Sequence, residues 1–523
     1  MLSFQQLLVI GSLLLLLSVV SSKASGKLGL PTLLLFLAIG MLAGWVARGQ
    51  HGFDNPQLAQ SVGILALALG VFAGGLQTDW ASVRPVLRNG LALSTVGVFI
   101  SAVLVAGFAH LALGLSLLEG LLLGAIISST DASTVFGLLR SERVNLRGQL
   151  RPLLELESGS NDPMAFFLTA SMIYLITHPG ASALALIPHF VQQMGLGAAL
   201  GLAMGRGAVG LVNHLRLEHD GLYPVLTVAV ALLTYSATSA LGGNGFLAVY
   251  AAGLVMGNSD FIHKKSLIRF HDGLAWLMQI AMFVLLGVLV PLAQVGAIWP
   301  RGCLLALFLI IVARPVTVFL TLFFSGLGWR DKALIAWVGL RGATPIILAT
   351  FPLLGGVSKA PLIFDLVFFV VTMSVLLKGA SLKRVARWLG VDAPVSRKRP
   401  APLEFVRTHG VKSDLMELAI PPDSAAAGKC IVDLGLPKGT LVVLIGRGAE
   451  FMIPSGGTAL ERGDTLLVLA DHDSLRETKR ILSVHRSEAA IEPATEDVPE
   501  MALSVQREEC ALEPEQLPGA GEG

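Results

Sequence analysis

The segment ELESGSND occupies residues 155–162 and lies inside a largely apolar run over residues 153–176. That run is long enough to cross the hydrocarbon core of a bilayer, which needs about 20 residues in a helix. Carboxylates are costly at such a depth, because lipid offers them neither water nor counter-ions. A spanning helix that retains Glu155, Glu157 and Asp162 is therefore predicted to carry a functional polar site.

Two other apolar runs carry charge in the same way. GAIISSTDASTVF at residues 124–136 places Asp131 after two serines and a threonine, side chains that compete for backbone hydrogen bonds and loosen a helix. GLRGATP at residues 339–345 places Arg341 between two glycines and ahead of Pro345, which also favours a broken helix. Interrupted helices in separate halves of a chain indicate the binding site of a transporter.

The composition of the whole chain is that of a membrane protein. Of 523 residues, 54% are hydrophobic and 14% are charged, and the mean hydropathy is +0.72, whereas soluble chains are roughly a quarter charged. A net charge of +2 gives no basic surface for nucleic acid, and three scattered cysteines exclude a cysteine-based zinc site. We expect a polytopic, all-α membrane protein with no cofactor and no nucleic-acid partner.

Thirteen apolar stretches are candidate transmembrane helices. They cover residues 7–20, 28–46, 59–76, 91–113, 117–139, 153–176, 184–204, 222–240, 245–256, 274–292, 303–324, 333–351 and 362–377. The odd-numbered loops hold fifteen Lys and Arg residues and the even-numbered loops three, which puts the N-terminus outside and the C-terminus in the cytoplasm. Because the first and ninth stretches are short, a count of twelve stays open.

The chain changes character after the last span. Residues 1–389 form the predicted transmembrane exchanger domain, and a basic, proline-containing linker follows at residues 390–402. Residues 403–485 contain short β-like runs near Leu415, from Leu441 and from Asp464, separated by turn signals, which predicts a small β-rich cytoplasmic domain. The tail at residues 486–523 has ten acidic and two basic residues, a composition typical of disorder.

The charged residues of the three interrupted or polar spans are expected to lie at one depth. At 1.5 Å per residue, Asp131, Asp162 and Arg341 lie about 12 to 14 Å from the cytoplasmic ends of their spans, close to the midplane of a core roughly 30 Å thick. Two carboxylates, the Ser158 hydroxyl and a freed carbonyl at Thr130 supply the oxygens that Na⁺ or K⁺ needs. A carboxylate that binds either a cation or a proton, but not both, gives antiport. Arg341 is predicted to form a structural ion pair with Glu155.

These three motifs resemble those of the monovalent cation:proton antiporter-1 family, NhaP type, over almost the whole membrane part. The resemblance implies a homodimer in a bacterial inner membrane, with thirteen helices, inverted repeats, crossed broken helices five and twelve, and elevator-like alternating access. It places the transported cation and the proton on Asp162 and Asp131, assisted by the backbone of Thr130 and Ser158. It implies that Glu157 and Asn161 bridge the crossed helices. The pair Asn161–Asp162 is similar to the electroneutral branch of the family.

Residues 403–485 are similar to the TrkA C-terminal domain, which implies a small α+β cytoplasmic regulatory domain that responds to small-molecule ligands. This pairing resembles the potassium/proton antiporters, so we expect export of K⁺ in exchange for external protons, in K⁺, pH and cell-volume homeostasis, and not catalysis. Many relatives carry an acidic residue before the paired glycines of span three, where this chain has Ala73. The residues leave two alternatives open, a Na⁺/H⁺ antiporter and a ligand-gated potassium channel, although the channel filter motif TVGYG is absent.

Overall fold

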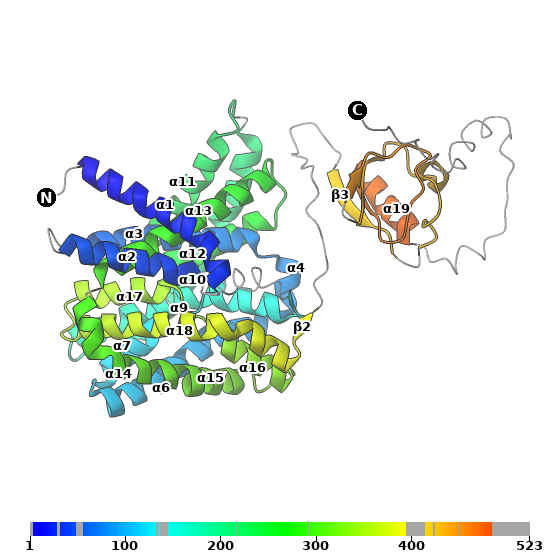
Figure 1. Ribbon diagram of the computed structural model, residues 1–523. Coiled ribbons are helices and arrows are strands. Elements are labelled where there is room, and N and C mark those ends of the chain that lie inside the picture. The colour runs from blue at the N-terminus through cyan, green and yellow to red at the C-terminus, as the bar shows by residue number, and fades with distance from the viewer. Residues whose placement is uncertain are drawn as a thin grey trace, which may run out of the picture. The chain divides into compact units, whose positions relative to one another are not determined.

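A computed structural model describes residues 4–28, 32–48, 56–131, 135, 145–215, 217–290, 292–393, 414–421, 424–448 and 450–483. The chain divides into two compact units, Met1–Ser396 and Arg397–Gly523. The first unit is helical and the second contains a small sheet (Figure 1). The predicted residues 132–134 and 136–139 of span five, most of the linker and the acidic tail lie outside the described residues.

The helices of the first unit follow the predicted apolar stretches. They are α1 (Phe4–Leu28), α2 (Thr32–Arg48), α3 (Pro56–Gln77), α4 (Trp80–Val83), α5 (Leu87–Ala92), α6 (Val98–Leu113), α7 (Leu117–Ser128), α9 (Leu150–Thr177), α10 (Leu186–His214), α11 (Leu222–Ala240), α12 (Gly245–Gly257), α13 (Lys264–Leu289), α14 (Leu292–Phe308), α15 (Arg314–Thr321), α16 (Trp329–Val338), α17 (Ala343–Leu354) and α18 (Ala360–Leu389). Short 3₁₀ and π turns join α4 to α6 and α14 to α15 into longer rods.

The apolar helices are numerous enough for a polytopic membrane fold. Among the described residues, seven helical stretches are long and apolar enough to cross a membrane, and eight when the bent pair α16–α17 counts as one. Four more apolar helices are shorter. Helix α9 carries the polar segment ELESGSND and is 28 residues long.

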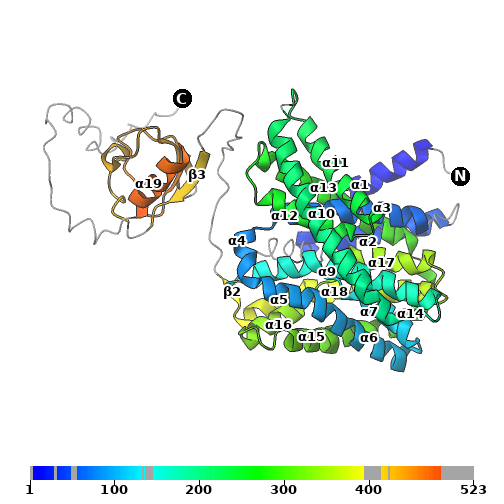
Figure 2. The ribbon, with the colours of Figure 1, turned by 180° about the vertical axis from the view of Figure 1, so that it is seen from behind.

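The helices pack in two groups. In Figures 1 and 2, α1–α3 and α10–α13 lie together, and α6, α7, α9 and α14–α18 lie together beside them. Helix α9 belongs to the second group, where it contacts α7, and it also contacts α12 of the first group. Close approach of α10 to α12 depends on the repeated glycines of α10, since a Cβ at Gly205 would lie 2.9 Å from Ala252 Cα. Small residues at these positions therefore allow the two helices to pack closely.

Proline and glycine act differently in the three polar spans. Helices α16 and α17 meet at an angle of 53°, separated by the residues from Gly339 to Gly342. Pro345 lies in the first turn of α17, where its missing N–H costs no helical hydrogen bond. Pro163, in contrast, lies inside α9, which continues through it to Thr177. Helix α7 ends at Ser128, before the predicted end of the fifth span, and residues 129–131 that follow it are not helical.

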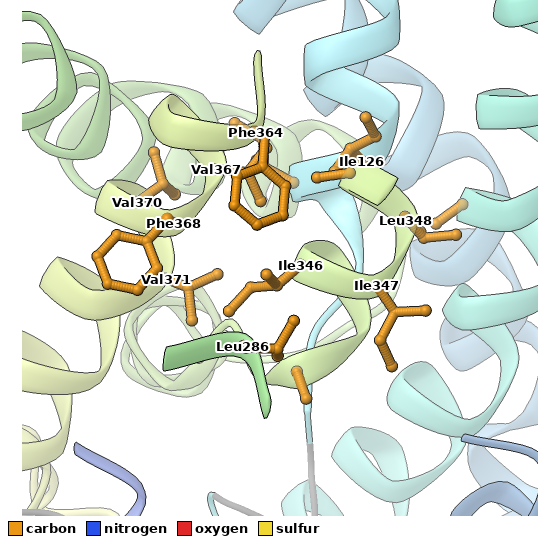
Figure 3. Packing of buried hydrophobic residues seen from close by; sticks show 14 of the residues in the cluster. Ile126, Leu286, Ile346, Ile347, Leu348, Phe364, Val367, Phe368, Val370 and Val371 are labelled. Atoms are coloured by element: carbon orange, nitrogen blue, oxygen red, sulfur yellow. The ribbon is translucent and has the colours of Figure 1, made fainter. Parts of the chain in front are cut away.

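Buried side chains of α17 fix its position. In Figure 3, Ile346 points toward Leu286, Phe364 and Val371, and Ile347 and Leu348 point to the other side of α17; all belong to one buried cluster. Each of the three α17 residues is at most 2% exposed. Because lipid is as apolar as these residues, their contribution comes from close van der Waals packing between helices. This packing holds the first turn of α17 next to the end of α7.

The second unit contains a four-stranded antiparallel sheet in the order β3-β6-β4-β5. Its strands are β3 (Asp414–Ala419), β4 (Leu441–Arg447), β5 (Glu450–Met452) and β6 (Thr465–Ala470), and helix α19 (His472–Ser483) packs against it. The predicted β-like runs coincide with β3, β4 and β6. Leu466, Val468 and Ala470 of β6 alternate with less buried neighbours and face the core that Leu475 and Leu482 of α19 complete.

A further pair of strands closes the first unit. Strand β1 (Asn145–Leu146), ahead of α9, pairs antiparallel with β2 (Asp392–Ala393), which follows α18. The backbone N–H of Arg147 also donates to Val391 O at 3.0 Å. The segment just ahead of α9 is thus hydrogen-bonded to residues 391–393, at the start of the predicted linker.

Candidate functional site

The end of α7 leaves backbone carbonyls without helical partners. The helix begins with a capping box between Ser116 and Glu119 and ends at Ser128, after which Ser129 is extended with φ −62° and ψ 139°. The Arg341 guanidinium donates to Ser128 O and, at 2.8 Å, to Ser129 O. A buried cation at the carbonyl end of a helix offsets the negative end of its dipole. Arg341 therefore stabilises the interruption in α7.

The interruption between α16 and α17 lies directly against the one that follows α7. Asp131 N donates to Leu340 O at 3.0 Å. A Cβ at Gly342 would overlap the Asp131 carboxylate, and a Cβ at Gly339 would lie 2.7 Å from Arg314 Nε. Both glycines of the GLRG motif are thus required by close approach, one to a carboxylate and one to a guanidinium.

Asp162 is the buried carboxylate at this junction. It is 8% exposed and accepts hydrogen bonds from the Ser129 hydroxyl and, at 3.3 Å, from the Thr344 hydroxyl. The charge of Asp131 interacts with it across the junction. Helix α9 and the non-helical segments that follow α7 and α16 therefore contribute oxygen atoms to one region. Asp131 and Asp162, which are predicted to converge, lie close enough there for their charges to interact.

Thr130 joins the unwound segment to α9 through two hydrogen bonds. Its carbonyl accepts from the Ser158 hydroxyl at 2.6 Å, and its hydroxyl accepts from Asn161 Nδ2 at 2.6 Å. The structure therefore brings Thr130, Ser158 and Asn161 together. The Thr130 carbonyl, predicted to be free for a cation, has Ser158 as its partner. Ala73 is buried in α3 and, as an alanine, offers no side-chain oxygen for a cation.

The predicted ion pair between Glu155 and Arg341 is wrong, and Glu157, expected to bridge the crossed helices, has its ion-pair partner in α15. Glu155 does not pair with Arg341; it pairs with Arg151, one turn earlier on α9, at 2.9 Å. Glu157 pairs instead with Arg314 at 2.6 Å, and both side chains are almost fully buried. The physical reason is helix rotation: residues 155 and 157 point to opposite sides of α9, so that Glu157 faces α15 and Glu155, which is partly exposed, does not. Arg341 is committed to the carbonyls that end α7.

Three polar residues of this region escaped sequence analysis. Ser129 and Thr344 were seen only as helix-loosening or flanking residues, yet both donate to Asp162. Lys378 lies one residue beyond the predicted end of span thirteen, whereas α18 continues to Leu389. Its position could have been found from periodicity, because Leu382, Ala386 and Leu389 follow it at helical spacing and are buried with it.

Fold and site together define a polytopic helical membrane protein. Its site holds the buried carboxylate of Asp162 between Ser129, which follows α7, and Thr344 in the first turn of α17. The model of the transmembrane sodium/hydrogen exchanger family matches residues 12–388, and the TrkA-C domain model matches residues 415–483. The protein belongs to the sodium/hydrogen exchanger family.

Relatives with curated names support the same family. The K(+)/H(+) antiporter NhaP2 of Shewanella oneidensis is 40% identical over 490 residues, covering 92% of this chain and 84% of that protein. The K(+)/H(+) antiporter NhaP of Alkalimonas amylolytica is 36% identical over 479 residues, covering 91% and 83%. The structure of the sodium proton antiporter MjNhaP1 from Methanocaldococcus jannaschii at pH 8 is similar with a TM-score of 0.63 and 24% identity, covering 73% of this chain and 99% of that one, which supports the fold.

Proposed function

We propose that this protein is a K⁺/H⁺ antiporter that exports K⁺ in exchange for external protons. The names of its 40% and 36% identical relatives support K⁺ as the cation. The observation that carries the site is Asp162, which is buried, receives two hydroxyl hydrogen bonds and interacts with the charge of Asp131. The cation is the transported substrate, and no resident cofactor is needed.

The proposed exchange follows from competition at the two carboxylates. When both are ionised, their mutual repulsion favours binding of a positive charge, either K⁺ or H⁺. The hydroxyls of Ser129 and Thr344 and the carbonyl of Thr130 are the neutral oxygens available to replace part of the hydration shell of K⁺. In the proposed site Ser158 supports the Thr130 carbonyl, while Asn161 fixes the unwound segment and Glu157 neutralises Arg314. One bound proton and one bound K⁺ carry the same charge, which gives electroneutral exchange.

Around this site we infer thirteen spans with inverted repeats, in which the interrupted helices five (α7) and twelve (α16–α17) cross. The inferred protein is a homodimer in a bacterial inner membrane, with the N-terminus periplasmic and the C-terminus cytoplasmic. The excess of Lys and Arg in alternate loops supports this orientation. Alternating access would carry the site from one side to the other, as a rigid group of helices moves against its neighbours.

We also propose a regulatory role for the second unit. The match to the TrkA-C domain at residues 415–483 supports a small-molecule ligand for the predicted domain at 403–485, joined by the linker at 390–402 and followed by the acidic tail at 486–523. A ligand that binds this unit and changes the exchange rate would establish the role. Loss of ligand response in a chain that still exchanges K⁺ for H⁺ at the basal rate, after deletion of residues 415–483, is the expected result.

Exchange in everted vesicles or proteoliposomes tests the proposed function. Addition of K⁺ should dissipate a preformed pH gradient, and a comparison with Na⁺, Rb⁺ and Li⁺ decides between K⁺ and Na⁺ as substrate. Asp162→Asn should abolish this response, because an amide neither titrates nor offers an anionic ligand. Asp365→Asn in α18, a carboxylate outside the site, is the matched control and should retain exchange. Retained exchange in Asp162→Asn would refute the site.

A further inference from the structure

Lys378 is a buried cation that the proposed exchange cycle does not use. It lies in α18, is 1% exposed, and its Nζ donates to Gly339 O at 2.8 Å. Removing an ammonium group from water is costly, and in a membrane-spanning segment such a residue is retained for function. Its hydrogen-bond acceptor is a backbone carbonyl and not a carboxylate, so a structural ion pair does not account for it.

The charges that face Lys378 do not neutralise it either. Arg314 and Arg341 repel it, and Glu157 attracts it. Glu157 is already paired with Arg314 at 2.6 Å. When Lys378 is protonated, the cluster of Lys378, Arg314, Arg341 and Glu157 therefore carries two positive charges in excess, next to a site whose two aspartates supply two negative charges when ionised.

The carbonyl that accepts the hydrogen bond of Lys378 lies at the C-terminal end of a helix. Helix α16 ends at Val338, and Gly339 is its C-terminal cap. Helix carbonyl ends carry partial negative charge and bind cations favourably. Arg341 holds the carbonyl end of α7 in the same way. The carbonyl ends of α7 and α16 thus each accept a hydrogen bond from a buried basic side chain, Arg341 and Lys378 respectively.

Gly339 also lies next to the residues that contact Asp131. It begins the four-residue break that continues through Leu340, the acceptor for Asp131 N, to Gly342, whose Cα approaches the Asp131 carboxylate. A shift of Gly339 therefore displaces the backbone against which Asp131 is placed. Lys378 fixes the first residue of that break.

We propose that Lys378 is a positioning residue of the cation site: it holds the carbonyl end of α16 and keeps the break against Asp131. This inference rests on the proposed K⁺/H⁺ exchange. It assigns to α18 a part in cation binding, exerted through Gly339 and not by contact with the ion.

Concentration dependence of exchange in proteoliposomes tests the proposal with full-length protein. Lys378→Met removes the donor and the charge, and the apparent KM for K⁺ should rise about tenfold, the effect of losing one charge-assisted hydrogen bond. Lys378→Arg retains both and should restore KM to within about threefold of the wild type. Arg384→Met, an exposed position on the same helix, is the matched control and should have the wild-type KM.

Backbone hydrogen exchange separates this inference from the proposed function. The backbone amides of residues 339–344 should exchange faster in Lys378→Met than in the wild type, whether or not the protein transports K⁺. Unchanged amide exchange, or a wild-type KM accompanied only by lower thermal stability, would overturn the positioning role. Wild-type protein that fails to exchange K⁺ for H⁺ would refute the proposed function instead. If Lys378→Met is not recovered from membranes, Lys378→Gln, which removes the charge and shortens the reach toward Gly339 O, is measured in the same two ways and should change KM and amide exchange in the same direction.

Discussion

The buried ion pair between Arg314 and Glu157 makes a quantitative prediction about stability. The two side chains are 4% and 2% exposed and their N–O distance is 2.6 Å. Arg314→Met would leave Glu157 buried without its partner, which typically costs about 3 to 5 kcal/mol. That is a large part of the roughly 5 to 15 kcal/mol by which a folded domain is stable. We expect the midpoint of thermal unfolding to fall by several degrees.

Two comparisons make this prediction specific. The double variant Arg314→Met with Glu157→Leu removes both charges and should recover much of the lost stability, because well-packed apolar residues replace buried ion pairs at little cost. Arg151→Met breaks the neighbouring pair to Glu155, whose arginine is 60% exposed, and should change stability by about 1 kcal/mol or less. Thermal unfolding of the purified protein, followed by tryptophan fluorescence, measures all three. Equal losses for Arg314→Met and Arg151→Met, or no recovery in the double variant, would refute the reasoning.

Three further predictions concern other contacts. Gly342→Ala would force a Cβ into the Asp131 carboxylate, and should reduce K⁺-dependent exchange with a stability loss of about 1 to 3 kcal/mol, measured by transport and thermal unfolding; wild-type exchange would contradict it. Asn244 caps α12 and donates to Pro163 O of α9 at 2.9 Å, so Asn244→Ala should cost about 1 to 2 kcal/mol in thermal unfolding; an unchanged midpoint would be inconsistent with that double role. Asp464 accepts from Arg447 Nη2 at 2.8 Å and is buried, so Asp464→Asn should speed backbone hydrogen exchange in β4 and β6 of the full-length protein and leave the helices unaffected; equal effects in both units would contradict a local role.

Hydropathy predicted where helices form but not where the longer ones end. The predicted span at residues 274–292 corresponds to α13, which begins at Lys264, and the span at 362–377 corresponds to α18, which continues to Leu389. In both cases the extra turns contain Lys and Arg that reduce the mean hydropathy while the helix itself continues. Long basic side chains extend toward water from such ends. Periodicity is the better signal there, and it reveals Lys378 on the buried face.

The junction of the polar spans was predictable in its members but not in their partners. Serine, threonine, glycine and proline next to Asp131 and Arg341 disclosed the interruptions, since each type has a local effect on the backbone. Partner choice depends on how α9 is rotated relative to α15, a tertiary property that spacing along one helix does not contain. For that reason Glu157, and not Glu155, has the buried arginine.

The pairing of β1 with β2 decides where this chain can be divided. A truncation after Leu389 follows the end of α18, but it would remove Asp392 and Ala393 and leave the backbone groups of Asn145 and Leu146 without their partners. Those two residues stand only a few positions ahead of the helix that carries Asp162. The membrane unit prepared alone should therefore retain residues through Ala393.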